Sequence, residues 1–302
     1  MRADRCRGRV DKRRQRVGEG ITMKKRMFAP IAAVGALVAA LALSACGASP
    51  AASDQGSAGS SSADAGGEIT TLTVGFDQAY PPYGYVGDDG EFTGLDLELA
   101  AEVAKRNDWE LKLEPIDWDA KDTLLNSGAI TCIWNGFTME GREDDYTFSD
   151  PYMLNAQVVV VRADSGIESF EDLAGKTVIT QVDSAAEEVL NGDMADLTAT
   201  FASLETIGDY NTAFMQLESG AVDAVACDLS IAQYQMAGKD TYKQLDEQLS
   251  TEHYAVGFKK GDTALAEKVT ETLKEMDEDG FVKELCDKYA DDGVSYDNWL
   301  IK

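Results

Sequence analysis

The residues with the clearest potential for ligand chemistry lie in the segment ITCIWNGFTMEGREDDYTFSDPY, which runs from Ile130 to Tyr152. Its only arginine, Arg142, follows the turn NGFT. A guanidinium group can hold a carboxylate through two parallel hydrogen bonds, so Arg142 is a candidate carboxylate clamp. A solvated surface ion pair is the alternative, because four acidic residues surround the arginine in the sequence: Glu140, Glu143, Asp144 and Asp145.

The elements that would position Arg142 follow from the pattern of apolar residues. Residues 130–134 are mostly apolar and rich in β-branched and aromatic side chains, which favours a short buried strand. The NGFT turn then falls at the carboxyl end of that strand, where open α/β sheets bind ligands. Further strands are predicted near 71–76, 111–115, 158–161, 176–180, 222–227 and 254–258, and helices begin near 95, 117, 184, 209, 262 and 281. This alternation predicts an α/β fold.

The length and the charge distribution of the chain limit the classes of protein to which it can belong. The 302 residues are enough for about two domains. Residues 1–26 hold 11 basic and 3 acidic residues, whereas the remainder holds 16 basic and 51 acidic residues. No basic stripe is left to neutralise phosphates, so we expect no nucleic-acid partner. His253 is the only histidine, and neither a metal-ligand cluster nor a nucleophile–base pair stands out. We therefore expect no cofactor, no metal and no catalytic residue.

The N-terminal 67 residues have the composition of an export segment. Residues 1–22 are Arg-rich, lack apolar periodicity and precede Met23, which indicates a mis-assigned N-terminal extension with Met23 as the true start; Met1 is the alternative. Residues 23–45 contain a basic start, an apolar run and a small-residue end, which predicts a signal peptide; a marginal transmembrane helix is the alternative. The ending Leu-Ser-Ala-Cys resembles the lipobox of bacterial lipoproteins, which implies lipidation of Cys46. Residues 46–67 are mostly Ala, Gly and Ser and predict a flexible linker.

Three cysteines lie in the predicted globular part, at Cys132, Cys227 and Cys286. Each is embedded in an apolar run, and their number is odd. Buried free thiols are the favoured interpretation, and a bridge between Cys132 and Cys286 is the alternative.

Five ordered blocks resemble the periplasmic-type polar amino-acid binding proteins of ABC importers, in extracellular solute-binding protein family 3. These blocks are GFDQAYPPYGY, GEFTGLDLELAAEVAKR, WNGFTMEGRED with FSDPY, SFEDLAGKTV and LESGAVDAVACD, and they cover nearly all of residues 70–290. The resemblance implies an α/β, two-lobed, periplasmic-binding-protein-like (type II) fold with two crossover hinge strands. Lobe 1 would comprise residues 68–160 plus 254–302, and lobe 2 residues 161–253.

The resemblance also implies which residues hold the α-carboxylate of a bound amino acid. Arg142 matches the arginine that forks onto it, and Thr138 with the amides around Gly136 would add donors. Ser184, at a helix N-terminus, would close on the same carboxylate from the second lobe. This chain departs from the family pattern in carrying one hydroxyl, at Thr138, where relatives usually carry two. It also places Asp183 before Ser184, and whether Asp183 contacts the ligand is left open.

The remaining implied contacts concern the ammonium group and the side chain of the ligand. Asp228 matches the acidic residue that binds the ammonium group. Tyr80 and Trp118 match aromatics that sandwich the side chain, and Asp77 would reach its polar end. Structural roles are the alternatives: core packing for the two aromatics, and helix capping for Asp228 and Ser184.

The function implied is that of an extracytoplasmic receptor, anchored to the membrane by a lipid on Cys46. It would bind a polar amino acid between its lobes and deliver it to the permease of an ABC transporter, and we expect a monomer. One alternative is a lyase or dehydratase that processes a carboxylate on the same fold. A sensor domain of a larger receptor is a third class, and it would carry a membrane span and a signalling module after the fold.

Overall fold

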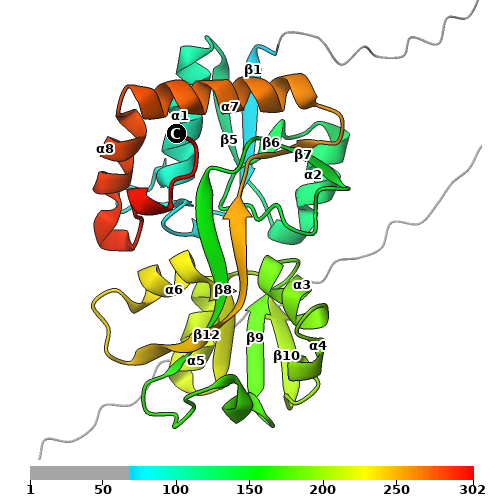
Figure 1. Ribbon diagram of the computed structural model, residues 1–302, viewed down its shortest axis with the longest axis vertical. Helices are drawn as coiled ribbons and strands as arrows, with labels where there is room; N and C mark the ends of the chain where they lie inside the picture. The colour runs from blue at the N-terminus through cyan, green and yellow to red at the C-terminus, as the bar shows by residue number, and fades with distance from the viewer. Residues whose placement is uncertain (1–68) are drawn as a thin grey trace, which may run out of the picture. The chain divides into compact units, whose positions relative to one another are not determined.

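Two five-stranded sheets form the framework of residues 69–302, which are the part of the chain that the computed structural model describes (Figure 1). The extension, signal peptide, linker and Cys46 predicted for the N-terminus lie outside the described residues. Three short strands form a separate small sheet, in the order β2-β3-β4. Their bounds are Ala79–Tyr80, Gly84–Val86 and Phe92–Thr93.

The first sheet has the strand order β5-β1-β6-β13-β7. The strands are β1 (Thr71–Phe76), β5 (Glu110–Pro115), β6 (Cys132–Ile133), β7 (Tyr146–Phe148) and β13 (Gly257–Lys259). Strand β1 is parallel to both of its neighbours, and β13 is antiparallel to β6 and β7. Four helices belong to this sheet (Figure 1): α1 (Leu95–Arg106), α2 (Lys121–Ser127), α7 (Thr263–Glu278) and α8 (Phe281–Lys288).

The second sheet has the order β10-β9-β11-β8-β12. Its strands are β8 (Met153–Arg162), β9 (Thr177–Gln181), β10 (Ser203–Ile207), β11 (Ala224–Asp228) and β12 (Tyr242–Tyr254). Strand β9 is parallel to β10 and β11, whereas β8 is antiparallel to β11 and β12. Its helices are α3 (Ala185–Asn191), α4 (Ala195–Thr198), α5 (Tyr210–Ser219) and α6 (Leu229–Met236). Short 3₁₀ turns cover Trp118–Ala120, Phe170–Leu173, Ala290–Asp292 and Tyr296–Asn298.

The apolar spacing in the sequence accounts for which side chains are buried. Helix α1 buries Leu95, Leu99 and Val103 completely, and these residues recur every four positions on one face. The run Val158–Val161 is at most 1% exposed, because β8 lies inside its sheet with covered faces. Trp299, near the C-terminus, is 1% exposed and packs against Tyr152.

Strands β8 and β12 connect the two sheets. They pair antiparallel along their length, from Met153 opposite Tyr254 to Arg162 opposite Tyr242. Figure 1 shows them side by side, running from the first sheet into the second. Two sheets joined by two long strands form two lobes with a hinge between them. The exact lobe boundaries at 160 and 254 stay a prediction.

Some elements differ from the expectations. The strand predicted at 130–134 is only two residues long, and β10 and most of β12 were missed because their residues are mainly polar and exposed at one edge. The three cysteines of the described part are buried and free, which confirms the favoured interpretation and excludes the bridge between Cys132 and Cys286. Within residues 69–302, no helix is both long and apolar enough to span a membrane.

Candidate functional site

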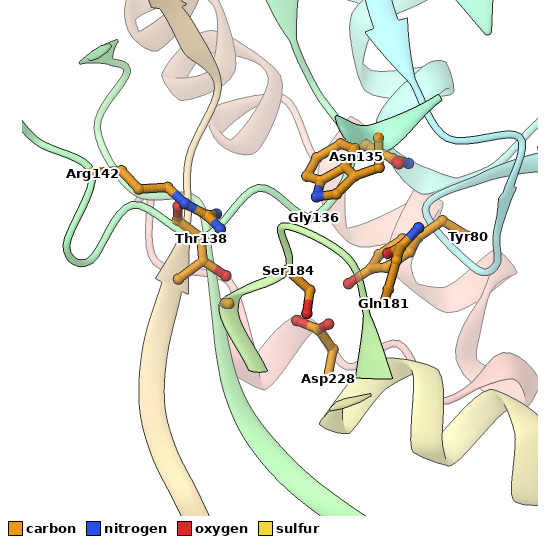
Figure 2. Close-up of a pocket in the computed structure, with 10 residues that line it drawn as sticks. Tyr80, Asn135, Gly136, Thr138, Arg142, Gln181, Ser184 and Asp228 are labelled. Atoms are coloured by element: carbon orange, nitrogen blue, oxygen red, sulfur yellow. The ribbon is translucent and has the colours of Figure 1, made fainter. Parts of the chain in front are cut away.

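A polar pocket lies where the two lobes meet (Figure 2). Seven of the eight predicted ligand-binding residues line it, and Asn135, Gln181 and Ala185 complete the lining. The seven are Tyr80, Trp118, Gly136, Thr138, Arg142, Ser184 and Asp228. The free volume between them is about 10 Å³, which is room for roughly one water molecule. An amino acid therefore fits only if the two walls move apart.

The NGFT turn is held in place by a carboxylate beneath it. Asp96, fully buried at the start of α1, accepts hydrogen bonds from the Gly136 amide at 2.6 Å and the Tyr152 hydroxyl at 2.7 Å. Gly136 has φ +56°, and a Cβ there would lie 3.1 Å from the rings of Tyr80 and Tyr254, so glycine is required. Burial raises the pKa of Asp96 to about 7, although both hydrogen bonds act in the opposite direction.

Arg142 is buried, and it pairs with a carboxylate of the second lobe and with a carbonyl of its own turn. The residue is 6% exposed, and its guanidinium lies over the ring of Phe137. Its Nη2 and Nε atoms donate to the same oxygen of Glu188, in α3, at 2.8 and 3.1 Å. Nη1 donates to the Thr138 carbonyl at 3.2 Å. The alternative of a solvated ion pair with its acidic sequence neighbours is therefore wrong.

The hydroxyl of Thr138, expected as a donor to a ligand carboxylate, has a partner within the protein. It donates to Oε1 of Glu252 at 2.9 Å, whereas the carbonyl of Thr138 accepts from Arg142. The hydroxyl is thus already engaged, and its role as a donor to a ligand carboxylate stays a prediction.

Asp228 ends β11 and is 4% exposed at the wall of the pocket. It occupies the position before α6, yet its side chain makes no capping hydrogen bond. Oδ1 of Asp228 instead accepts from Asn155, Gln157 and the Tyr254 hydroxyl, at 2.8–2.9 Å. The capping alternative for Asp228 is therefore wrong, and the three donors hold the carboxylate toward the pocket.

Ser184 combines capping with a position in the pocket. It is the N-cap of α3, and its hydroxyl oxygen accepts from the Glu187 amide at 3.2 Å. The Glu187 carboxylate in turn accepts a hydrogen bond from the amide of Asp183, one residue before the N-cap. Ser184 also lines the pocket, so the two roles are compatible.

Replacing Ser184 with alanine separates these two roles. Loss of the cap alone should lower the free energy of unfolding by about 1 kcal/mol. If Ser184 also binds ligand, the affinity of the folded variant should fall as well. Urea denaturation and a ligand titration of the same sample measure both quantities, and an unchanged affinity would leave Ser184 with the capping role only.

Of the other predicted residues, the two aromatics line the pocket and Asp77 does not. Tyr80 and Trp118 line the pocket and are 6% and 8% exposed, so they pack in its wall, and their contact with a ligand stays a prediction. Asp77 does not line it. Its carboxylate accepts from the Ala79 amide at 2.8 Å and from Gln181 at 2.6 Å, and burial raises its pKa. The bond to Gln181 joins the two lobes.

The carbonyl of Asp183 forms a second junction between the lobes. It accepts from the Trp118 indole at 3.1 Å and from Lys121 and Arg142 at 3.4 Å each. Asp183 has φ +54°, a left-handed conformation that points its carbonyl toward these donors. Burial and the neighbouring charge of Arg142 lower the pKa of Lys121. These contacts hold the pocket nearly shut.

Several site residues were missed by sequence reasoning. Asn135 and Ala185 adjoin predicted residues along the chain, Gln181 lies three residues before Ser184, and none of the three was singled out. Asn155 and Gln157 are polar residues at alternate positions of a strand that is otherwise apolar, and this signal was available. Glu252 lies in a strand that was not predicted.

Two α/β lobes, two connecting strands and a polar pocket between the lobes define the class of two-lobed solute-binding proteins. A family profile agrees: residues 72–292 match the bacterial extracellular solute-binding proteins, family 3. The chain belongs to this family, which confirms the fold class. The family consists of substrate-binding receptors, so the chain is a receptor and not an enzyme, and the lyase alternative is set aside.

The relatives agree with this assignment. The L-cystine-binding protein TcyJ of Escherichia coli (strain K12) is 31% identical over 74% of this chain and 83% of its own. The arginine-binding extracellular protein ArtP of Bacillus subtilis (strain 168) is 28% identical over 82% of this chain and 92% of its own. A substrate-binding protein of an ABC uptake transporter from Streptococcus pneumoniae, solved with bound histidine, is 31% identical. It superposes with a TM-score of 0.72 over 75% of this chain and 95% of its own.

Proposed function

We propose that this receptor binds a free polar amino acid between its lobes and presents it to the permease of an ABC transporter. The observation that carries the proposal is the pairing of opposite charges in one pocket: Arg142 on one wall and Asp228 on another, both at most 6% exposed. A zwitterion leaves water at low cost only where both of its charges meet hydrogen-bonding partners. The relatives named for cystine and arginine support an amino acid as that zwitterion.

The carboxylate of the ligand would replace an internal partner of Arg142. The Nε and Nη2 edge of the guanidinium now contacts Glu188, and Nη2 also contacts the Asp183 carbonyl. The Ser184 hydroxyl and the amides of the NGFT turn would supply further donors. Entry then requires the lobes to separate about β8 and β12, and the ligand would restore the closed arrangement.

The side chain of the ligand would lie against Tyr80 and Trp118. Relatives named for cystine, arginine and histidine make basic and sulfur-containing amino acids the first candidates. Asp77 would favour a cationic side chain once the lobes open, because opening frees its carboxylate from Gln181.

The location of the receptor follows from the same family. Its members are extracellular solute-binding proteins. We infer that Cys46 carries the lipid that anchors a monomeric receptor at the outer face of the cell membrane, with residues 46–67 as the tether and the residues from Met23 to residue 45 as the signal peptide. Labelling with a radioactive fatty acid and a Cys46→Ala variant test this anchor, and equal labelling of both proteins would contradict it.

A thermal-shift panel tests the proposed function. Purified residues 68–302 are heated with each of the twenty amino acids and with cystine. A ligand present at 100 times its dissociation constant should stabilise the protein by about 2.7 kcal/mol, and thus raise the melting temperature by several degrees. We expect this shift for one chemical class only. A flat panel would contradict amino-acid binding.

A further inference from the structure

Two buried carboxylates meet beside the pocket, one at the end of β11 and one on β12, which joins the lobes. Asp228 is at the end of β11, and Glu252 lies in β12 and is 2% exposed. Two side-chain amides from β8 lie between them. Asn155 Nδ2 donates to Asp228 Oδ1 at 2.9 Å and to Glu252 Oε1 at 2.7 Å. Gln157 Nε2 donates to the same two oxygens at 2.8 and 2.7 Å. Neutral groups thus bridge two acids.

Positive charge is absent from this cluster among residues 69–302. The remaining donors are hydroxyl groups, from Tyr254 to Asp228 and from Thr138 to Glu252. The nearby cations have other partners. His253 follows Glu252 in β12, but its ring contacts Glu140. The side chain of Arg142 pairs with Glu188, and only its contact with the Thr138 carbonyl leads toward the cluster.

Two buried carboxylates without a cation are costly to ionise together, because each disfavours the charge of the other. Such a pair lowers its energy by keeping one proton. Burial, followed by the charge of Asp228, raises the pKa of Glu252 to about 8, while the amides and the Thr138 hydroxyl act in the opposite direction. Near neutral pH the Glu252 carboxyl therefore holds a proton.

We propose that Asp228 and Glu252 act together as the acceptor for the ligand's ammonium group, and that a proton held by Glu252 is released when the ammonium binds. This inference rests on the proposed function. Asp228 lines the pocket and would touch the ammonium group, whereas Glu252 does not line it and acts through Asp228 and the bridging amides as a positioning residue. The O–H bond of Glu252 breaks, its proton passes to solvent, and the ammonium group keeps all of its protons.

The charges make this exchange favourable. The free pair with one proton carries a single negative charge, because a second negative charge would be buried beside the first without a cation. The approaching positive charge stabilises the ionised form of Glu252 and so lowers its pKa in the complex. Below pH 8 the free protein must lose the proton before or during binding. Affinity should therefore be full above pH 8 and fall as the pH is lowered, by at most about tenfold per pH unit for one proton.

Isothermal titration calorimetry at pH 7 measures how many protons are released for each ligand that binds. L-arginine and L-cystine are titrated into the wild-type protein in phosphate and in Tris, whose ionisation enthalpies differ. For whichever probe binds, we expect release of about half to one proton per ligand. The E252Q variant should bind with no proton release and with an affinity that is constant between pH 6 and pH 8. Binding by the wild-type protein without any proton exchange would overturn the inference, and this outcome does not depend on the folding of the variant.

A matched variant controls for loss of an acid near the hinge. Glu140 is half-exposed and paired with His253, outside the pocket. E140Q should release as many protons as the wild-type protein. If E252Q releases the same number as well, the proton does not come from Glu252 and the inference is wrong. If neither probe nor any other amino acid binds, the proposed function itself is overturned.

Discussion

Replacing Arg142 with alanine should abolish measurable amino-acid binding, with a loss of affinity of at least about 100-fold. A guanidinium that pairs with a carboxylate in a buried site contributes about 2–5 kcal/mol, much of it because the partner is otherwise left buried without a countercharge. Arg142 is 6% exposed and lines the pocket, so solvent does not screen this interaction. Calorimetry with the amino acid identified by the thermal-shift panel measures the change.

The same variant should fold almost normally. In the ligand-free protein, Arg142 pairs with Glu188, whose side chain is 48% exposed. Solvent weakens such a pair, which contributes about 0–1 kcal/mol. The melting temperature of the ligand-free variant should therefore change by less than about 4 °C. An unaltered affinity in R142A would refute the assignment of the carboxylate clamp.

Glu188→Gln is the matched control for this prediction. It removes the charge that now occupies the guanidinium and keeps the size of the side chain. Because the carboxylates of Glu188 and of the ligand compete for the same edge of Arg142, E188Q should bind the ligand as tightly as the wild-type protein or more tightly. A loss as large as that of R142A would instead mean that Glu188 is needed to hold the arginine in position.

The second large effect should come from Asp96, which lies beneath the NGFT turn. Asp96→Ala leaves the Gly136 amide and the Tyr152 hydroxyl without their acceptor in a fully buried place. Each orphaned buried donor costs about 1–3 kcal/mol, so the free energy of unfolding should fall by about 3–5 kcal/mol. Urea denaturation at pH 6 tests this value. Ligand affinity should fall too, because Gly136 lines the pocket.

Asp96→Asn gives this prediction a dependence on pH. The pKa of Asp96 is about 7 in the folded protein and about 4 in the unfolded chain. The folded state therefore binds the proton more tightly, and the associated stability is complete below pH 4 and lost as the pH rises through 7. The D96N variant lacks this titration. The unfolding free energy of D96N, relative to that of the wild-type protein, should therefore rise by on the order of 3 kcal/mol between pH 4 and pH 8. If this difference between the two proteins stayed constant with pH, the burial of an ionisable carboxyl at Asp96 would be contradicted.

Local patterns were sufficient to predict the larger features of this protein. The strand near 71–76 and the helices that begin near 95 and 209 depend on neighbouring residues, and they appear in the structure as β1, α1 and α5. The turn NGFT and Arg142 are also close in sequence, so their shared place in the pocket could be anticipated. The strands β10 and β12 were missed because polar edge strands bury few side chains and so show little alternation.

The partners of the site residues depended on the tertiary structure. Gly136 meets Asp96 from 40 residues away, Arg142 meets Glu188 from 46, and Thr138 meets Glu252 from 114. Such long-range contacts produce no periodic pattern in the sequence, because each partner looks like any other polar residue of its own segment. The sequence, with its family resemblance, therefore predicted an arginine and an acid as candidates for the two ends of a zwitterion. Only the folded chain, by bringing β8, β11 and β12 together, showed that the acid is one of a pair and has no cation beside it in the described part of the protein.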